Sequence, residues 1–260
     1  MTTPTAGSLY ADLSRYYDGF CAGVDYAEQA AFLQRAQTCF GESGGRDHLD
    51  LGCGTGVLMS HMQRLGYTVS GLDYSRDMLD AAARRCPEAE LLHGDMAALE
   101  ADSRYDLISS LLYSLHYSHP LTALSETLRR AFRALKPGGM LVFDAVDKRG
   151  IQGREAVSQG QEAGATFTYR SGWVYGGQGD TMELRVSIQR EEDGQVTQWQ
   201  DHHPMTAFTF DDLQARLAAC GFDTVLLERD FSTLRAWEGQ TLNILVAARK
   251  PHPAESPATT

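Results

Sequence analysis

The chain has 260 residues, of which 43% are hydrophobic, so it can build one large domain or two small ones around a sizeable core. Its 34 Asp and Glu residues against 23 Lys and Arg give a formal net charge of −11. An acidic surface repels phosphate backbones and anionic lipids, which argues against nucleic-acid and membrane partners.

The sequence also lacks the marks of a membrane or exported protein. No apolar run approaches the about 20 residues that a membrane helix requires, and residues 1–5 lack the basic and apolar regions of a signal peptide. The five cysteines are scattered and form no C-x-x-C pair, so we expect reduced, buried thiols rather than disulfides or a zinc site. A cytoplasmic location follows.

Strand-like and helical patterns alternate from about residue 46 to residue 145. The apolar runs predict five strands, at residues 46–51, 67–72, 89–92, 105–112 and 140–144. Helical spacing of apolar residues separates them at 57–65, 77–85 and 121–135. This alternation is typical of a doubly wound parallel sheet.

The pattern changes after residue 150. Strand-favouring residues and glycine-containing turns predict three antiparallel strands, at 166–174, 182–190 and 195–203. A helix at 210–220 and two closing strands, 223–230 and 240–249, complete the chain. We therefore predict an α/β fold with a doubly wound, mostly parallel seven-stranded sheet and an antiparallel β insert after strand five.

The turn after the first predicted strand is the most informative segment. Gly52, Gly54 and Gly56 stand at every second position between an apolar strand and a helical pattern. Glycine lets the backbone turn tightly and lets a ligand lie against the main chain. The dinucleotide pattern G-x-G-x-x-G needs its third glycine one residue later, so this spacing does not fit NAD.

Acidic residues stand at the ends of three successive predicted strands. Asp50 ends the first, Asp73 follows the second, and Asp95 follows the third. Each alone could be a helix cap, but ligands of open parallel sheets bind beyond the carboxyl ends of the strands. A carboxylate at Asp73 can accept hydrogen bonds from both hydroxyls of a ribose.

These features resemble the class I, Rossmann-like methyltransferases that depend on S-adenosylmethionine (AdoMet). Residues 50–56 are similar to motif I, 71–75 to motif II, 105–117 to motif IV with its following loop, and 135–139 to the turn before strand five. The insert is placed as in amino-sugar N,N-dimethyltransferases and glycine N-methyltransferase-like enzymes. The resemblance implies AdoMet as cofactor and S-adenosylhomocysteine as product.

The same resemblance implies the cofactor site and the domain organisation. The cofactor-binding residues would be Tyr17, Asp50, Gly52, Cys53, Gly54, Asp73, Tyr74, Met78, Gly94, Asp95, Met96 and Ser110. The segments would be N-terminal lid helices (1–45), the AdoMet-binding core (46–150), an antiparallel insert covering the substrate (151–206), a C-terminal helix and hairpin (207–250) and a disordered tail (251–260). The composition of residues 1–8 also predicts disorder.

The catalytic candidates are His116, Tyr113 and Tyr17. An amine acceptor needs little beyond orientation, whereas a hydroxyl acceptor usually needs a general base. His116 follows motif IV, and its unperturbed pKa of about 6.5 suits proton transfer; the alternative is a structural histidine. Tyr17 could contact the cofactor or be a buried aromatic residue.

Two further groups of residues have a structural explanation as well as a functional one. His202 and His203 follow Asp201, but neighbouring strand residues point to opposite faces and no third ligand is visible, so we expect no metal site. Four aromatic residues of the insert region could line an acceptor pocket or belong to the core: Trp173, Tyr175, Trp199 and Phe208.

We therefore predict an enzyme that methylates N or O of a small-molecule acceptor. The alternatives are a non-catalytic AdoMet-binding regulator or scaffold, and a tRNA or protein methyltransferase. The acidic charge argues against tRNA, and residues 109–112 lack the Asn/Asp-Pro-Pro-aromatic motif of many amide or base methylating enzymes. The expected partner is the small acceptor. We expect no nucleic-acid or membrane partner, and the sequence is compatible with a homodimer.

Overall fold

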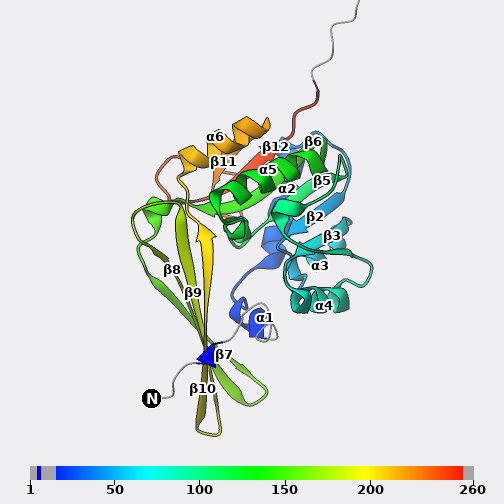
Figure 1. Ribbon diagram of the computed structural model, residues 1–260. Coiled ribbons are helices and arrows are strands. Elements are labelled where there is room, and N and C mark those ends of the chain that lie inside the picture. The colour runs from blue at the N-terminus through cyan, green and yellow to red at the C-terminus, as the bar shows by residue number, and fades with distance from the viewer. Residues whose placement is uncertain (1–4, 7–15, 254–260) are drawn as a thin grey trace, which may run out of the picture.

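The computed structural model describes residues 5–6 and 16–253 and contains two β-sheets (Figure 1). The larger sheet has seven strands in the order β11-β12-β6-β5-β2-β3-β4. Their bounds are β2 Asp47–Leu51, β3 Thr68–Asp73, β4 Glu90–His93, β5 Tyr105–Ser110, β6 Leu135–Val146, β11 Asp223–Glu228 and β12 Asn243–Arg249. Strands β2 to β6 are parallel, and β12 is antiparallel to both β6 and β11. The predicted fold class is confirmed.

The strand order reverses between β2 and β5. The chain runs outward from β2 through β3 to β4, then returns to the other side of β2 to place β5 and β6. Such a reversal opens a crevice at the carboxyl ends of the two central strands. The glycine turn after β2 therefore lies where a ligand of this fold binds.

Helices cover both faces of the larger sheet. Their bounds are α2 Tyr26–Phe40, α3 Val57–Arg64, α4 Arg76–Arg85, α5 Leu121–Ala134 and α6 Phe210–Cys220. One buried cluster joins α5 and α6 to one face of the sheet, and the other joins α2, α3 and α4 to the opposite face.

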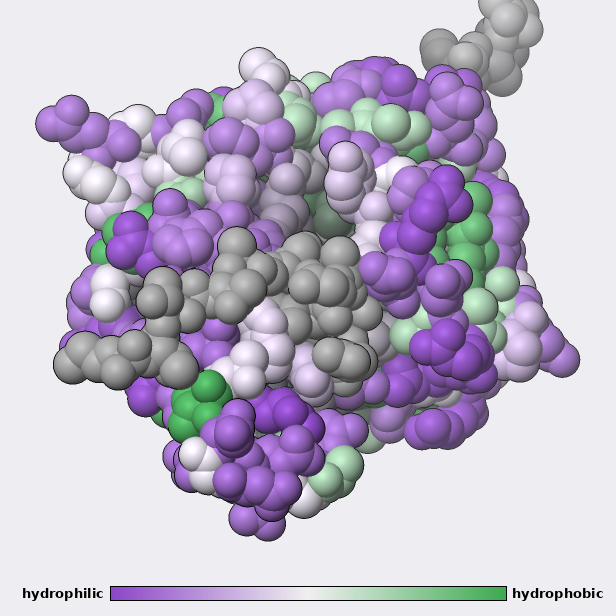
Figure 2. Space-filling model, turned by 60° about the horizontal axis from the view of Figure 1, so that its bottom comes forward, coloured by the Kyte–Doolittle hydropathy of each residue, from purple (hydrophilic) through white to green (hydrophobic). Residues whose placement is uncertain are grey.

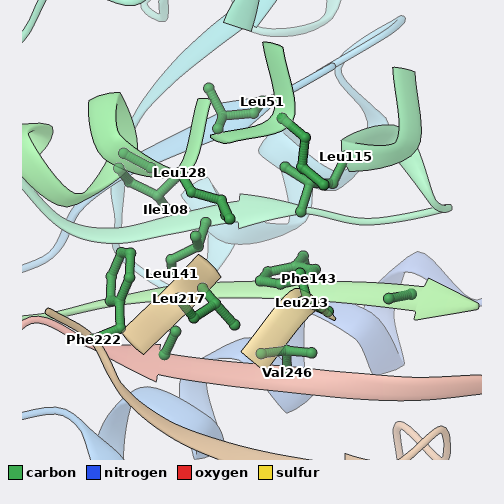
Figure 3. Packing of buried hydrophobic residues seen from close by; sticks show 14 of the residues in the cluster. Leu51, Ile108, Leu115, Leu128, Leu141, Phe143, Leu213, Leu217, Phe222 and Val246 are labelled. Carbon is green, nitrogen blue, oxygen red and sulfur yellow. The ribbon is translucent and has the colours of Figure 1, made fainter. Parts of the chain in front are cut away.

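Figure 3 shows the first of these clusters. Leu128 of α5 and Leu217 of α6 point toward Leu141 and Phe143 of β6. Because strand side chains alternate between faces, the neighbouring Val142 belongs to the cluster on the other side. Strand β6 is therefore apolar on both faces, as expected for a central strand with helices on both sides.

The second sheet is the insert, with strand order β1-β10-β9-β8-β7. Its bounds are β1 Thr5–Ala6, β7 Glu155–Glu162, β8 Ala165–Tyr175, β9 Thr181–Glu192 and β10 Gln195–Thr206. Strands β7 to β10 form antiparallel pairs, and β1 pairs parallel with β10. Figure 1 shows this sheet extending from one end of the core, with α1 (Tyr17–Phe20) between it and the rest.

Three predictions about the elements need correction. The insert has a strand that the sequence missed, β7, because this edge strand is almost wholly exposed and lacks alternating apolar residues. Strand β6 begins at Leu135, not at residue 140. Thr5 and Ala6 form β1 instead of belonging to a disordered start.

Other predictions remain untested. The remainder of 1–8 and most of the predicted tail (254–260 of 251–260) lie outside the described residues. The five-part division of the chain also stays a prediction. Within the described ranges, no helix is long and apolar enough to span a bilayer. The face of the molecule shown in Figure 2 is largely hydrophilic with small hydrophobic patches, in keeping with the net charge of −11.

Candidate active site

The loop after β2 takes the conformation that its glycines predict. Gly52, Gly54 and Gly56 have positive φ angles of 74°, 52° and 78°, a region that only glycine adopts readily. A Cβ atom on Gly52 would lie only 3.0 Å from Cβ of Ser114. The loop thus needs glycine both for its backbone and for the space beside it.

The carboxylate of Asp73 ties this loop to the end of β3. Its Oδ2 accepts a hydrogen bond of 2.8 Å from the Gly54 N–H, and its Oδ1 accepts one of 2.8 Å from the Ser75 N–H. Burial raises the pKa of Asp73, and these backbone hydrogen bonds oppose the rise. Each carboxylate oxygen has further acceptor capacity toward a ligand.

Asp50 belongs to a buried polar chain across β2 and β5. The Ser109 hydroxyl donates a hydrogen bond of 2.7 Å to Asp50 Oδ1, and His48 Nε2 lies 2.8 Å from the same hydroxyl. Burial raises the pKa of Asp50 to about 7 and lowers the pKa of His48 to about 3. His48 is therefore neutral, and Nε2–H donates to the serine.

Two adjoining hollows lie at the carboxyl ends of these strands. The larger is a cavity of about 550 Å³ whose lining includes Asp73, Tyr74, Gly94, Asp95 and Met96. The smaller is lined by Tyr26, Gln29, Asp50, Cys53 and Thr55, among others. Both share a set of lining residues, Tyr17, Gly52, Gly54, Leu112 and Ser114. The volume is in the range of small-molecule sites.

A hydrogen bond joins helix α1 to the glycine loop. Asp18 accepts hydrogen bonds of 2.6 Å from the Thr55 hydroxyl and of 2.6 Å from Arg85 of α4. On its other side α1 packs on the insert, where a Cβ atom on Gly19 would overlap the Tyr169 hydroxyl. These contacts place Tyr17 at the boundary between the two hollows.

Most of the residues predicted to bind the cofactor lie around the hollows. Those that line one or both are Tyr17, Asp50, Gly52, Cys53, Gly54, Asp73, Tyr74, Gly94, Asp95 and Met96. Met78 and Ser110 line neither hollow. Met78 is fully buried in α4, and the buried Ser110 hydroxyl donates to the Leu51 carbonyl. Their side chains are committed to the core.

The structure also brings residues to the hollows that the sequence analysis did not single out. Leu112 and Ser114 come from the loop after β5, and Gln29 comes from α2. The Gln29 side chain is buried, and its Oε1 has no hydrogen-bond partner within residues 5–6 and 16–253. Nothing local in the helical pattern of α2 distinguishes this glutamine from the others.

His116 does not have the geometry of the predicted base. Its Nδ1 lies 2.8 Å from the Thr206 carbonyl, and its Nε2 accepts a hydrogen bond of 3.2 Å from the Val146 N–H. The ring stacks on Phe208 at 4.4 Å, and burial lowers its pKa to about 4. Because both nitrogens serve backbone groups, the prediction of a base is corrected to a structural histidine that fixes the insert to β6.

Tyr113 is likewise held in place beside the hollows. Its N–H donates a 2.7 Å hydrogen bond to Asp144, its hydroxyl donates to Asn243 at 3.2 Å, and its ring meets the edge of Trp173 at 4.6 Å. Arg229, which pairs with the buried Asp144 at 3.0 Å, lies over the same ring. Tyr113 lines neither hollow, so this geometry does not favour the catalytic role predicted for it.

The loop after β5 and strand β10 also line the larger cavity. Tyr117, Ser118 and His119 line it from the loop, and His203 and Pro204 line it from the insert. As strand alternation requires, the side chain of His202 is directed elsewhere, to Glu183 at 3.1 Å. The four aromatic residues considered for this pocket line neither hollow: Trp173, Tyr175, Trp199 and Phe208. Among the described residues no His, Cys, Asp and Glu cluster could hold a metal ion.

Known proteins share this arrangement. Residues 49–139 match the family described as "Methyltransferase domain". A dTDP-3-amino-3,4,6-trideoxy-alpha-D-glucopyranose N,N-dimethyltransferase of Streptomyces venezuelae is 28% identical over 224 residues, which cover 84% of this chain and 92% of the relative. These similarities support a class I, AdoMet-dependent methyltransferase that acts on a small molecule.

Solved structures agree with this assignment at the level of the fold. The sugar N-methyltransferase of Streptoalloteichus sp has a TM-score of 0.79 at 23% identity and covers 97% of this chain and 98% of its own. An amino pentose methyltransferase from Micromonospora echinaspora, solved with SAM bound, has a TM-score of 0.74 at 21% identity and covers 96% and 100%. The insert is therefore part of a shared architecture.

Asp50 predicts a distinctive pH dependence of stability. Its folded pKa of about 7 exceeds the unfolded value, so the stability that it contributes is full below about pH 4 and is lost as the pH rises through 7. Asparagine does not ionise, so we expect Asp50→Asn to remove this loss. As the pH rises from about 5 to 8, the free energy of unfolding of the variant should increase by roughly 2–4 kcal/mol relative to that of the parent. Chemical unfolding without AdoMet measures it, with the exposed Asp80→Asn as control. Parallel curves for parent and variant would contradict the assignment.

Proposed function

We propose that this methyltransferase transfers methyl groups from AdoMet to the amino group of a sugar-sized acceptor. The observation that carries the proposal is the lining of the larger cavity, which combines the acidic strand ends Asp73 and Asp95 with Tyr117, His119 and His203. A cofactor held by the strand ends would leave the part of the cavity beside Tyr117, His119 and His203, the proposed acceptor end, to the acceptor.

The residues present fit AdoMet. We assign the ribose hydroxyls to Asp73, whose carboxylate lies at the end of β3, and the methionine part to the smaller hollow. There the buried Gln29 Oε1, which has no partner among the described residues, would accept a hydrogen bond from the ammonium of the cofactor. When bound, AdoMet supplies a methyl group on a positively charged sulfur, and this charge suits a pocket lined by Asp50, Asp73 and Asp95.

The role of the protein would be alignment and protection from water. Fixing an acceptor in line with a methyl group can lower the barrier by about 7–11 kcal/mol. Tyr117 and Ser118 lie on a short loop held by the hydrogen bond of the Thr206 hydroxyl to the Ser118 carbonyl, at 2.7 Å. That bond joins the loop after β5 to the insert, so it ties the two segments beside the proposed acceptor end together.

An amine is the preferred acceptor over a hydroxyl. The S. venezuelae relative is named as an N,N-dimethyltransferase of a dTDP-linked amino sugar, and the alignment with it spans the larger part of both chains. Amine nitrogen is also the better nucleophile once it has lost one proton. Two statements about partners stay predictions: that the protein binds no nucleic acid and that it can form a homodimer.

The cofactor assignment predicts the effect of removing the charge at the ribose. Asp73→Asn keeps the shape of the side chain but loses the charge-assisted acceptor, typically worth about 1.5–3 kcal/mol. Calorimetry with S-adenosylhomocysteine should show a Kd weakened by roughly 10- to 100-fold. Asp80→Asn, on the exposed face of the neighbouring α4, should bind as the parent does. Unchanged affinity in Asp73→Asn would overturn the site.

The acceptor class is tested with a matched pair of substrates. The parent protein is incubated with AdoMet and either dTDP-3-amino-3,4,6-trideoxy-alpha-D-glucopyranose or the same sugar nucleotide with a hydroxyl in place of the amine. Mass spectrometry should show methylation of the amino sugar alone. Methylation of the hydroxyl sugar would reassign the enzyme to O-methylation. AdoMet binding with no transfer to either compound would contradict the proposed acceptor and favour another acceptor or a binding protein.

A further inference from the structure

We propose that His203, oriented by Asp201, takes the proton from the ammonium form of the acceptor and so generates the nucleophilic amine. The inference rests on the proposed function, because it concerns the same acceptor end of the cavity. It assigns to the insert a catalytic residue that the resemblance to methyltransferase motifs does not supply.

The two side chains lie on the same face of β10. Residues two apart on a strand point in the same direction, and His203 Nε2 is 3.0 Å from Asp201 Oδ2. The exposed fractions of the two side chains are only 14% and 18%. His203 lines the larger cavity, and its ring meets the Tyr117 ring at 5.7 Å across the acceptor end.

The charge state of the pair suits a base. Burial is the largest cause that lowers the pKa of His203; His202 lowers it further, while Asp201 raises it. The imidazole is therefore neutral at pH 7. Nε2 is the ring nitrogen that lies 3.0 Å from Asp201 Oδ2, so we assign the proton of the neutral ring to Nε2 and the lone pair to Nδ1. Once Nδ1 is protonated, Asp201 stabilises the imidazolium, as the carboxylate of a catalytic triad does.

Other titratable groups at this end are less suited. His119 Nε2 contacts the Thr181 hydroxyl at 3.1 Å, and His116 uses both ring nitrogens for backbone groups. Glu183, on the neighbouring strand β9, pairs with Arg185 and His202. Among the histidines that line the cavity, His203 alone has a carboxylate partner in the described part of the chain.

Bonds, electron pairs and protons balance in the proposed step. An N–H bond of the acceptor ammonium breaks, its proton bonds to Nδ1 of His203, and the electron pair stays on the acceptor nitrogen. That nitrogen attacks the methyl carbon while the carbon–sulfur bond breaks and its electron pair returns to sulfur. The imidazolium then releases its proton to water. One ammonium, one sulfonium and no other reactant give a methylammonium, a thioether and one proton.

The test is the pH profile of kcat in His203→Ala, measured with saturating AdoMet and dTDP-3-amino-3,4,6-trideoxy-alpha-D-glucopyranose. A general base typically contributes 10²–10⁴, so we expect a loss of about 10²-fold near pH 7. The loss should shrink to within about threefold near pH 9, where hydroxide and buffer deprotonate the amine. Added imidazole should restore part of the rate near neutral pH. The Kd for S-adenosylhomocysteine should be unchanged.

Two further variants sharpen the result. Asp201→Asn should lower kcat near pH 7 by about tenfold, since the imidazolium loses its partner, and should lower the pKa of His203 followed by NMR of the resting protein. His202→Ala alters the adjacent histidine, whose side chain is 53% exposed and directed to Glu183. Because His202 lowers the pKa of His203, its removal should move the pH profile slightly upward in pH, but kcat near pH 7 should stay close to that of the parent.

The outcomes separate the two proposals. If the parent transfers no methyl group to this amino sugar, the proposed function fails, and this inference fails with it. If the parent is active but His203→Ala loses activity equally at every pH, or loses none, the inference alone is overturned. An NMR pKa of His203 that does not respond to Asp201→Asn contradicts the pairing of the two side chains.

Discussion

The site depends on the carboxylate of Asp73 and the glycine loop that it holds. The loop after β2 carries three residues in the left-handed region, and the Asp73 carboxylate accepts hydrogen bonds from Gly54 and Ser75 N–H groups, thereby joining the ends of two neighbouring strands. A buried carboxylate is stable only with such donors. The same donors hold it beside the cavity, so the constraint that closes the turn also positions the carboxylate to which we assign the ribose hydroxyls.

The insert lines the larger cavity together with the core and is joined to it by direct contacts. Its strand β10 supplies part of the lining of the larger cavity, and the aromatic side chains of β8 pack on helix α1, as in the contact of Phe20 with Tyr169 at 6.0 Å. His116 fixes this sheet to the core through the Thr206 carbonyl and the Val146 N–H. The glycine loop, helix α1 and the insert are therefore connected by direct contacts.

The sequence predicted what local patterns encode. The parallel core, the glycine turn and the acids at the strand ends follow from spacing and residue type, and these residues do meet at one edge of the sheet. Contacts between distant segments could not be predicted. The pairing of His116 with Thr206, ninety positions apart, converts a candidate base into a structural residue. The exposed polar edge strand β7 carries no apolar alternation, and the burial of Gln29 depends on how α2 packs.

The most direct test of the account is a crystal structure of the protein with S-adenosylhomocysteine. The account predicts ribose hydroxyls within hydrogen-bonding distance of the Asp73 carboxylate, the amino group of the ligand beside Gln29 and its sulfur directed toward Tyr117 and His203. A ligand whose ribose lies away from Asp73, or whose sulfur faces away from the end formed by β10, would contradict it.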